Sequence, residues 1–292
     1  MGFSFADFAA ALKAGAAISA EDVLEVRRWA WPDGAISTAE AEALFELNRS
    51  AKDKAPEWDD FFVEAMTEHV VNQTAPRGYV DEARAAWLIG QVDRDGTPVE
   101  LALVVKIVET ALNCPASLKS WALGRIEAGV LANGVIDAAE VDLLRRLVFA
   151  AGGEGALGVG ADEAELLWRL KDATLGADNA PGWKTLFVQA VGNHLMAYSS
   201  YRPLERDEAA RLDSFVADHR ASVLGFFARM ARTSPRAFRP GVPPIDRDAA
   251  VAAANAVTPD EEKWLEAHVD ADGARDPLEQ ALLAFVDESK TP

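Results

Sequence analysis

The chain has 292 residues, half of them hydrophobic, and a formal net charge of −18 at pH 7. This length allows a substantial core, and the negative charge argues against a nucleic-acid backbone as a partner. The single cysteine, Cys114, excludes an intrachain disulfide and is typical of a cytoplasmic protein. No apolar run is long enough to predict a transmembrane segment.

Helical spacing of apolar residues dominates from the N-terminus onward. Val23 and Val26 share one helical face, and Leu101, Val104 and Val108 form a nearly all-apolar one. Alanine-rich segments with few β-branched runs also favour helices over strands. The periodicity therefore predicts an all-α protein.

A block of the sequence occurs twice. Residues 53–69 (the first block) recur as residues 178–194 (the second block), with the same spacing of Asp, Ala-Pro, Trp, Phe and His. Weaker matches link 23–47 with 123–147 upstream. Such repetition predicts two tandem, diverged helical repeats packed as a pseudo-symmetric bundle. Two separable domains are the alternative.

The matches divide the chain into an N-terminal helical segment at 1–18, a first repeat at 19–114 and a second repeat at 115–292. The second repeat is longer, which predicts insertions near 150–175 and within 199–256. Insertions of this size are tolerated at surface connections, because the entropy of loop closure grows slowly with length.

Helix starts are marked by a cap residue followed three positions later by Glu. In such a capping box, the first side chain accepts from an amide near the helix start and the Glu accepts from the cap amide. These turns therefore predict helix junctions that need no ligand. The pattern occurs at Ser37, Thr97, Asp137, Asp162, Thr258 and Asp276.

Two of these turns also resemble part of an EF-hand loop. Calcium needs several oxygen ligands around one turn, and a glycine permits the sharp bend. We therefore expect a candidate site for Ca²⁺ or another divalent cation, with no other cofactor indicated. The candidate ligands are Asp270, Asp272, Asp276 and Glu279 in one turn, and Asp93 and Asp95 in the other.

The pattern Asp/Asn-Gly-x-Ile-x-x-x-Glu, followed by Leu at helical spacing, occurs near 31–48 and 131–148. It resembles the TerB-like helical domains of the tellurite-resistance group. The resemblance implies a small all-α domain linked to stress response and membrane-associated systems. It also implies metal contact by acidic residues. The acidic residues to which the resemblance would assign this metal contact are Asp33, Glu40, Asp137 and Glu140.

The histidines His69 and His194 end the two blocks at matching positions, which suggests a paired metal site in an enzyme. Neither lies in a Glu-x-x-His spacing, and each follows the apolar face of its helix, so a core or helix-end role is the alternative. No nucleophile elbow, phosphate-binding loop or dinucleotide fingerprint is present. The sequence therefore favours a non-catalytic protein.

Residues 220–239 combine apolar and basic side chains at helical spacing. Such a segment is a candidate for contact with a protein partner or, peripherally, with a membrane surface. The alternative is that it folds back onto the acidic body. We expect a non-catalytic cytoplasmic interaction or stress-response module, with a cation sensor or a metal-dependent enzyme as alternatives. The candidate contact residues are Phe226, Phe227, Arg229, Met230 and Arg232.

Overall fold

The computed structural model describes residue 10 and residues 17–30, 35–73, 75–94, 97–150, 158–196, 259–269 and 275–289. Within these residues the protein is helical almost throughout, which confirms the predicted all-α class. Its strands there are β1 (Ala17–Ile18) and β2 (Asp53–Lys54), which pair in parallel.

The helices are short and follow one another closely. The first are α2 (Ala20–Ala30), α3 (Thr38–Ser50), α4 (Glu57–Thr67), α5 (Glu82–Val92) and α6 (Pro98–Thr110). Helix α4 continues into a π-helical turn, η1 (Glu68–Asn72). The remaining described helices are α7 (Ala116–Asn133), α8 (Ala138–Val148), α9 (Ala161–Ala173), α10 (Gly182–Met196), α14 (Pro259–Val269) and α15 (Pro277–Ser289).

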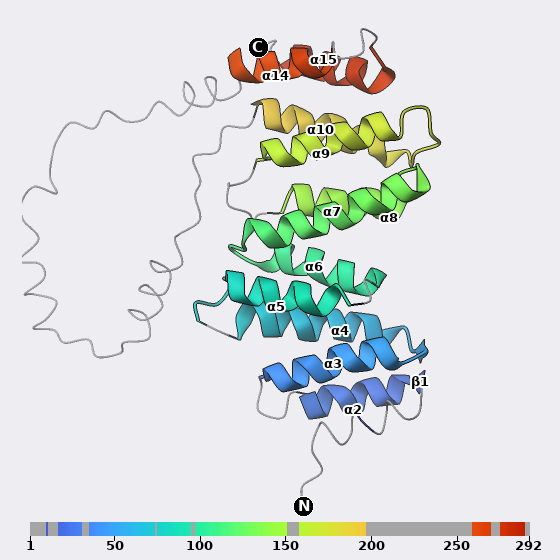
Figure 1. Ribbon diagram of the computed structural model, residues 1–292, viewed down its shortest axis with the longest axis vertical. Coiled ribbons are helices and arrows are strands. Elements are labelled where there is room, and N and C mark those ends of the chain that lie inside the picture. Colours follow the sequence, from blue (N-terminus) through green and yellow to red (C-terminus); the bar gives the residue numbers. More distant parts are fainter. Residues whose placement is uncertain are drawn as a thin grey trace, which may run out of the picture.

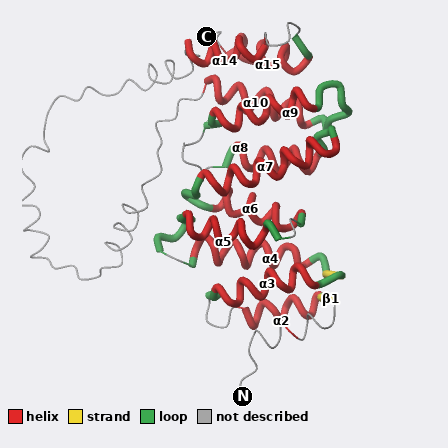
Figure 2. Tube along the Cα trace, in the orientation of Figure 1, coloured by secondary structure: helices red, strands yellow, loops and turns green. Residues whose placement is uncertain are grey.

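The helices form an elongated stack, from α2 at one end to α14 and α15 at the other (Figures 1 and 2). Helices α2, α4, α6, α8, α10 and α15 contact one another in series and make up the first row. The second row contains α3, α5, α7, α9 and α14, joined by helix contacts and by the ring pairs Phe45–Trp87 and Trp168–Trp264. One continuous hydrophobic core runs between the rows.

Local chemistry explains where the helices begin. The predicted capping boxes form at Ser37 and Asp137. Asp276 and Glu279 likewise bond reciprocally at the start of α15. At Thr97 only half of the box forms, because Glu100 accepts from the Thr97 amide while the Thr97 hydroxyl has no partner among the described residues. The predicted cap at Asp162 was wrong, because the cap residue of α9 is Gly160, two residues earlier, and Glu163 accepts from the amide of Gly160.

Contacts around the first block recur around the second. The His69 ring packs on Trp87 with centroids 5.5 Å apart, and the His194 ring packs on Trp264 at 5.4 Å. Arg27 of α2 pairs with Glu64 of α4, and Arg145 of α8 donates to Gln189 of α10. Helix α8 therefore contacts α10 as α2 contacts α4.

Helix α9 lies where the sequence predicted an insertion, yet its contacts match those of α3. Phe45 of α3 packs edge-on against Phe62 of α4 at 5.1 Å, and Trp168 of α9 packs against Phe187 of α10 at 5.5 Å. These contacts place α9 in the position that α3 occupies relative to α4.

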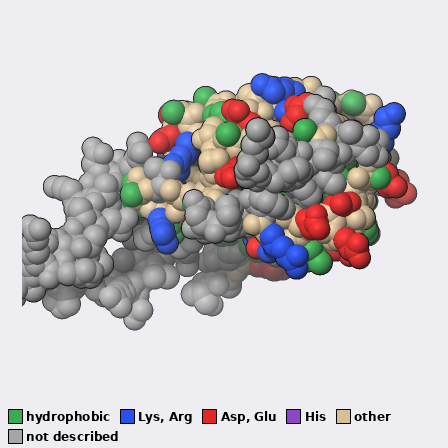
Figure 3. Space-filling model, turned by 90° about the horizontal axis from the view of Figure 1, so that it is seen from below, with side chains coloured by type: hydrophobic (Ala, Val, Ile, Leu, Met, Phe, Trp, Pro, Cys, Tyr) green, Lys and Arg blue, Asp and Glu red, His purple; other side chains and the backbone are tan. Residues whose placement is uncertain are grey.

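The final helix differs from α6 in one respect. Both begin at a proline and carry a buried glutamate at the same position within the helix, Glu100 in α6 and Glu279 in α15. Val105 and Val108 of α6 are buried, whereas the corresponding Ala284 and Asp287 of α15 are exposed. The outer face of α15 is thus small and polar. Seen along the stack from below, exposed hydrophobic side chains of the described residues appear singly, among charges of both signs (Figure 3).

Candidate functional site

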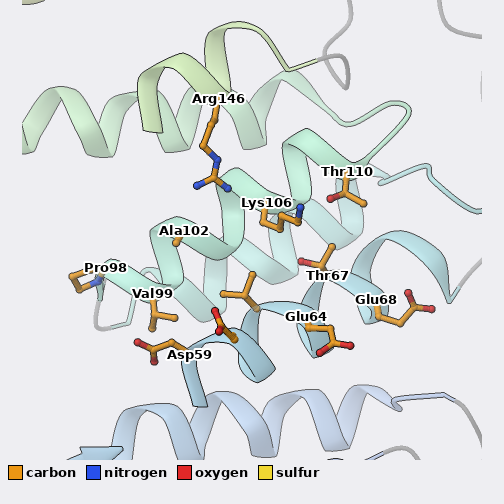
Figure 4. Close-up of a pocket in the computed structure, with 12 residues that line it drawn as sticks. Asp59, Glu64, Thr67, Glu68, Pro98, Val99, Ala102, Lys106, Thr110 and Arg146 are labelled. Atoms are coloured by element: carbon orange, nitrogen blue, oxygen red, sulfur yellow. The ribbon is translucent and has the colours of Figure 1, made fainter. Parts of the chain in front are cut away.

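A groove of about 940 Å³ opens on the first row between α4, α6 and α8. Its floor is apolar, formed by Val63 of α4 and by Val99 and Ala102 of α6, all partly exposed. Charged side chains stand around this floor (Figure 4). The groove therefore combines apolar contact area with charged walls, as recognition surfaces do.

The wall on the α4 side is acidic. Asp59, Asp60, Glu64 and Glu68 all line the groove. Arg27 approaches Glu64 to 2.6 Å, and the Asn72 amide donates to Glu68 at 2.7 Å. Asp60 and Glu64 of α4 and Glu68, which begins η1, lie four residues apart along the continuous helix, so they form one edge of it.

Cations lie on the opposite side. Lys106 projects from α6 and Arg146 descends from α8, facing the acidic wall across the floor (Figure 4). Arg146 donates to both carboxylate oxygens of Glu109, at 3.0 and 2.8 Å. This hydrogen bonding lowers the pKa of Glu109 and raises that of Arg146. The guanidinium is therefore fixed at the rim with its charge retained.

Thr67 supplies an unsatisfied polar group in the groove lining. Its side chain is 7% exposed, and its hydroxyl oxygen has no hydrogen-bond partner among the described residues. A buried hydroxyl without a partner costs about 1–3 kcal/mol. The groove lining therefore contains one buried hydroxyl that the described residues leave without a hydrogen bond.

The matching region of the second block is different. Lys184, Thr185, Gln189 and Asn193 stand at the positions of the four acids. Gly192 stands at the position of Thr67, and a Cβ added there would lie 2.5 Å from Cε1 of Phe285. Because Phe285 corresponds to Lys106, an aromatic ring covers the place where the first block has its groove.

In the described part of the predicted cation turn near 268–279, a lysine side chain lies against the acidic side chains. Lys171 of α9 lies 2.8 Å from Asp276 and 2.5 Å from Glu279. Burial alone would lower the pKa of Lys171, but its hydrogen bonds to Asp172, Asp276 and Glu279 raise it. The ammonium thus already pairs with two of the proposed ligands. The other two, Asp270 and Asp272, lie outside the described residues.

The second predicted cation turn contains one described ligand. Asp93 accepts a hydrogen bond from the indole nitrogen of Trp121 at 2.8 Å, and Asp95 lies outside the described residues. Across the described ranges, no cluster of three or more His, Cys, Asp or Glu side chains could hold a metal ion.

The structure does not bring His69 and His194 together, because α6 and α8 lie between their helices in the first row. Each histidine bonds through Nδ1 to a backbone carbonyl, that of Ile36 at 2.7 Å and that of Val159 at 3.0 Å. A carbonyl only accepts, so Nδ1 carries the proton in both rings. Each histidine ties the end of its helix to the start of another.

The residues that carry the TerB-like resemblance form helix junctions. Ile36 and Ile136 are buried, and Glu40 and Glu140 complete capping boxes. Gly134 ends α7 with a φ of 72°, a conformation that glycine adopts without strain. Asp33 lies outside the described residues.

The basic segment 220–239 lies outside the described residues, together with its candidate contacts Phe226, Phe227, Arg229, Met230 and Arg232. In the part of the chain that is described, no helix combines the length and apolar character needed to cross a membrane.

Comparison of the chain with protein-family models, with curated proteins and with solved structures finds no match.

Proposed function

We propose that the protein is a non-catalytic interaction module in which the groove between α4, α6 and α8 receives a segment of a protein partner. The sequence led us to expect such a module, and the groove adds a defined surface for it. Its apolar floor supplies contact area, and its opposed charges supply specificity. A cytoplasmic stress-response role of TerB-like type remains part of this proposal, on the strength of the resemblance alone.

We also propose that the chain is a tandem duplication with a changed register. Helices α2 to α6 would correspond to α8, α9, α10, α14 and α15. Arg27 contacts α4 as Arg145 contacts α10, and Phe45 contacts α4 as Trp168 contacts α10. These matching contacts support the correspondence. Under it, residues 161–173 belong to the shared scaffold, and only α7 has no counterpart among the described helices.

The observation that carries the functional proposal is the difference between the two grooves. The same scaffold closes the site with Phe285 over Gly192 in one half and leaves it open over Thr67 in the other. Closure improves packing, because filling a gap restores contacts between side chains. An open groove with an unsatisfied hydroxyl is therefore not required by the fold, and partner binding explains it.

Selection from a random peptide display library tests the proposal. We expect enriched peptides that slow hydrogen exchange of α4 and α6 amides in the full-length protein. The double variant T67G/K106F copies Gly192 and Phe285, so it should close the groove and lose this binding. The variant E266K, on the exposed surface of α14, should bind normally.

Absence of enriched peptides would contradict the proposal. So would unchanged binding by a T67G/K106F variant whose circular dichroism and thermal unfolding match those of the parent.

A further inference from the structure

We infer that the occupant of the groove is a basic amphipathic peptide segment of a partner protein, with its cations along α4 and its apolar face on the floor. This inference rests on the proposed function and adds the chemistry of the partner. The acidic edge from Asp60 to Glu68 covers about two turns of helix, or about 12 Å. The partner segment therefore needs cationic side chains over a similar length.

The charge pattern of α4 is the first argument. Like charges four residues apart destabilise a helix by about 0.2–0.5 kcal/mol per pair. Asp60, Glu64 and Glu68 form two such pairs, whereas the matching positions in α10 carry Thr185, Gln189 and Asn193. The scaffold thus folds without these charges in its other half. A cationic ligand explains why α4 keeps them.

The side chains that surround the acidic wall are the second argument. Glu64 already has Arg27 as a partner and Glu68 accepts from Asn72, but Asp59 and Asp60 are exposed beside them. The wall therefore stays negative over the first turn and a half of α4. Negative potential there attracts Lys and Arg side chains and repels an anionic membrane surface.

Thr67 is the third argument. Its buried hydroxyl has no partner in the described part of the chain and lies on the groove side of α4, between the acidic edge and Lys106 (Figure 4). A hydroxyl oxygen accepts hydrogen bonds from ammonium and guanidinium groups. This oxygen is covered in the unbound protein, so a basic side chain that reaches past the carboxylates would satisfy it by displacing the side chains above it.

The cations on the other wall set the orientation of the segment. Lys106 repels basic side chains and Arg146 is already paired with Glu109, so the carboxylates that basic side chains can reach lie on the α4 side. The opposite edge of the bound segment must be neutral or acidic. An amphipathic peptide with one basic edge meets both requirements.

The test uses the full-length protein and two labelled peptides of about four helical turns. Both have Leu at the same positions, with Lys at the polar positions of one and Glu at those of the other. Fluorescence anisotropy should show binding of the Lys peptide that weakens at least about tenfold from low to high salt, because screening reduces exposed charge contacts. The Glu peptide should bind at least about tenfold more weakly.

The matched variant D59K/D60T/E64Q/E68N carries the residues of the second block. It should keep the thermal stability of the parent and lose at least about tenfold in affinity for the Lys peptide. The conservative variant D60N/E64Q should lose part of the affinity. This partial loss shows that the larger loss in the fourfold variant reflects the missing charges and not a folding defect. The reversed variant D59K/D60K/E64K/E68K should prefer the Glu peptide.

Equal binding of the two peptides, or full affinity in the folded D59K/D60T/E64Q/E68N variant, would overturn the inference. If display-selected peptides bind the groove but carry no basic residues, the inference fails while the proposed function stands. If neither those peptides nor the Lys peptide binds there, both fail.

Discussion

The ammonium of Lys171 on α9 lies 2.5 Å from the carboxylate of Glu279 on α15, and both side chains are only 2% exposed. The corresponding contact in the first half joins Asn48 of α3 to Glu100 of α6, at 3.4 Å. The two halves thus satisfy a buried glutamate in different ways. One uses an amide and the other uses a charge.

This difference predicts unequal effects of two substitutions. K171M leaves Glu279 buried without its cation and should destabilise the protein by about 3–5 kcal/mol. K171N installs the residue used at the matching position, whose amide can donate to Glu279, so it should lose at least about 1 kcal/mol less. Urea unfolding followed by circular dichroism measures both, and equal losses would contradict the prediction.

The same cluster predicts a dependence of stability on acid pH. Burial alone would raise the pKa of Asp276, but its bonds with Lys171 and two backbone amides lower it below the ordinary value of 3.8. Its contribution is therefore complete above about pH 4–5 and is lost as the pH falls through the lowered pKa. The free energy of unfolding should decline below pH 4, and less steeply in D276N. Parallel declines in the two proteins would argue against this assignment.

The two block tryptophans should respond differently to loss of the indole nitrogen. Trp58 donates to Asn48 at 3.0 Å, whereas the buried indole nitrogen of Trp183 has no acceptor among the described residues. W58F breaks a hydrogen bond and should cost about 1 kcal/mol more than W183F. Both lose similar volume, so thermal unfolding of the pair isolates the bond. A larger loss in W183F would count against it.

Packing at Gly192 predicts that the second groove can be opened. G192T places side-chain atoms against Phe285 and should destabilise the protein by about 1–3 kcal/mol. Adding F285K reproduces the Thr67–Lys106 pair of the first half and should recover most of that loss. Differential scanning calorimetry compares the two variants. The prediction fails if F285K adds to the damage.

The helical class and most helix starts could be predicted, because periodicity and capping are local properties of the sequence. The same locality limits what the sequence indicates about which helices of the two halves correspond. Ser37 and Asp137 both precede capping glutamates, so their helices matched although α8 contacts α10 as α2 contacts α4. Capping patterns recur at every junction and do not identify which junction is equivalent.

Helix α9 resembles α3 in its contacts but not in its residues. Lys171 and Trp168 of α9 make the contacts that Asn48 and Phe45 make in α3. The groove was missed because it needs three helices that are distant in sequence. One signal was present: every acid on the groove edge of α4 is absent from the otherwise matching second block.

The exposed Ala284 and Asp287 on the last helix have a consequence for self-association. A stack of helices can in principle lengthen by adding another molecule at its open end. Where α6 has valines that its neighbours cover, α15 has a small residue and a charged one, so a further helix would bury little apolar surface there. The protein should therefore stay monomeric through this end at high concentration rather than grow into filaments.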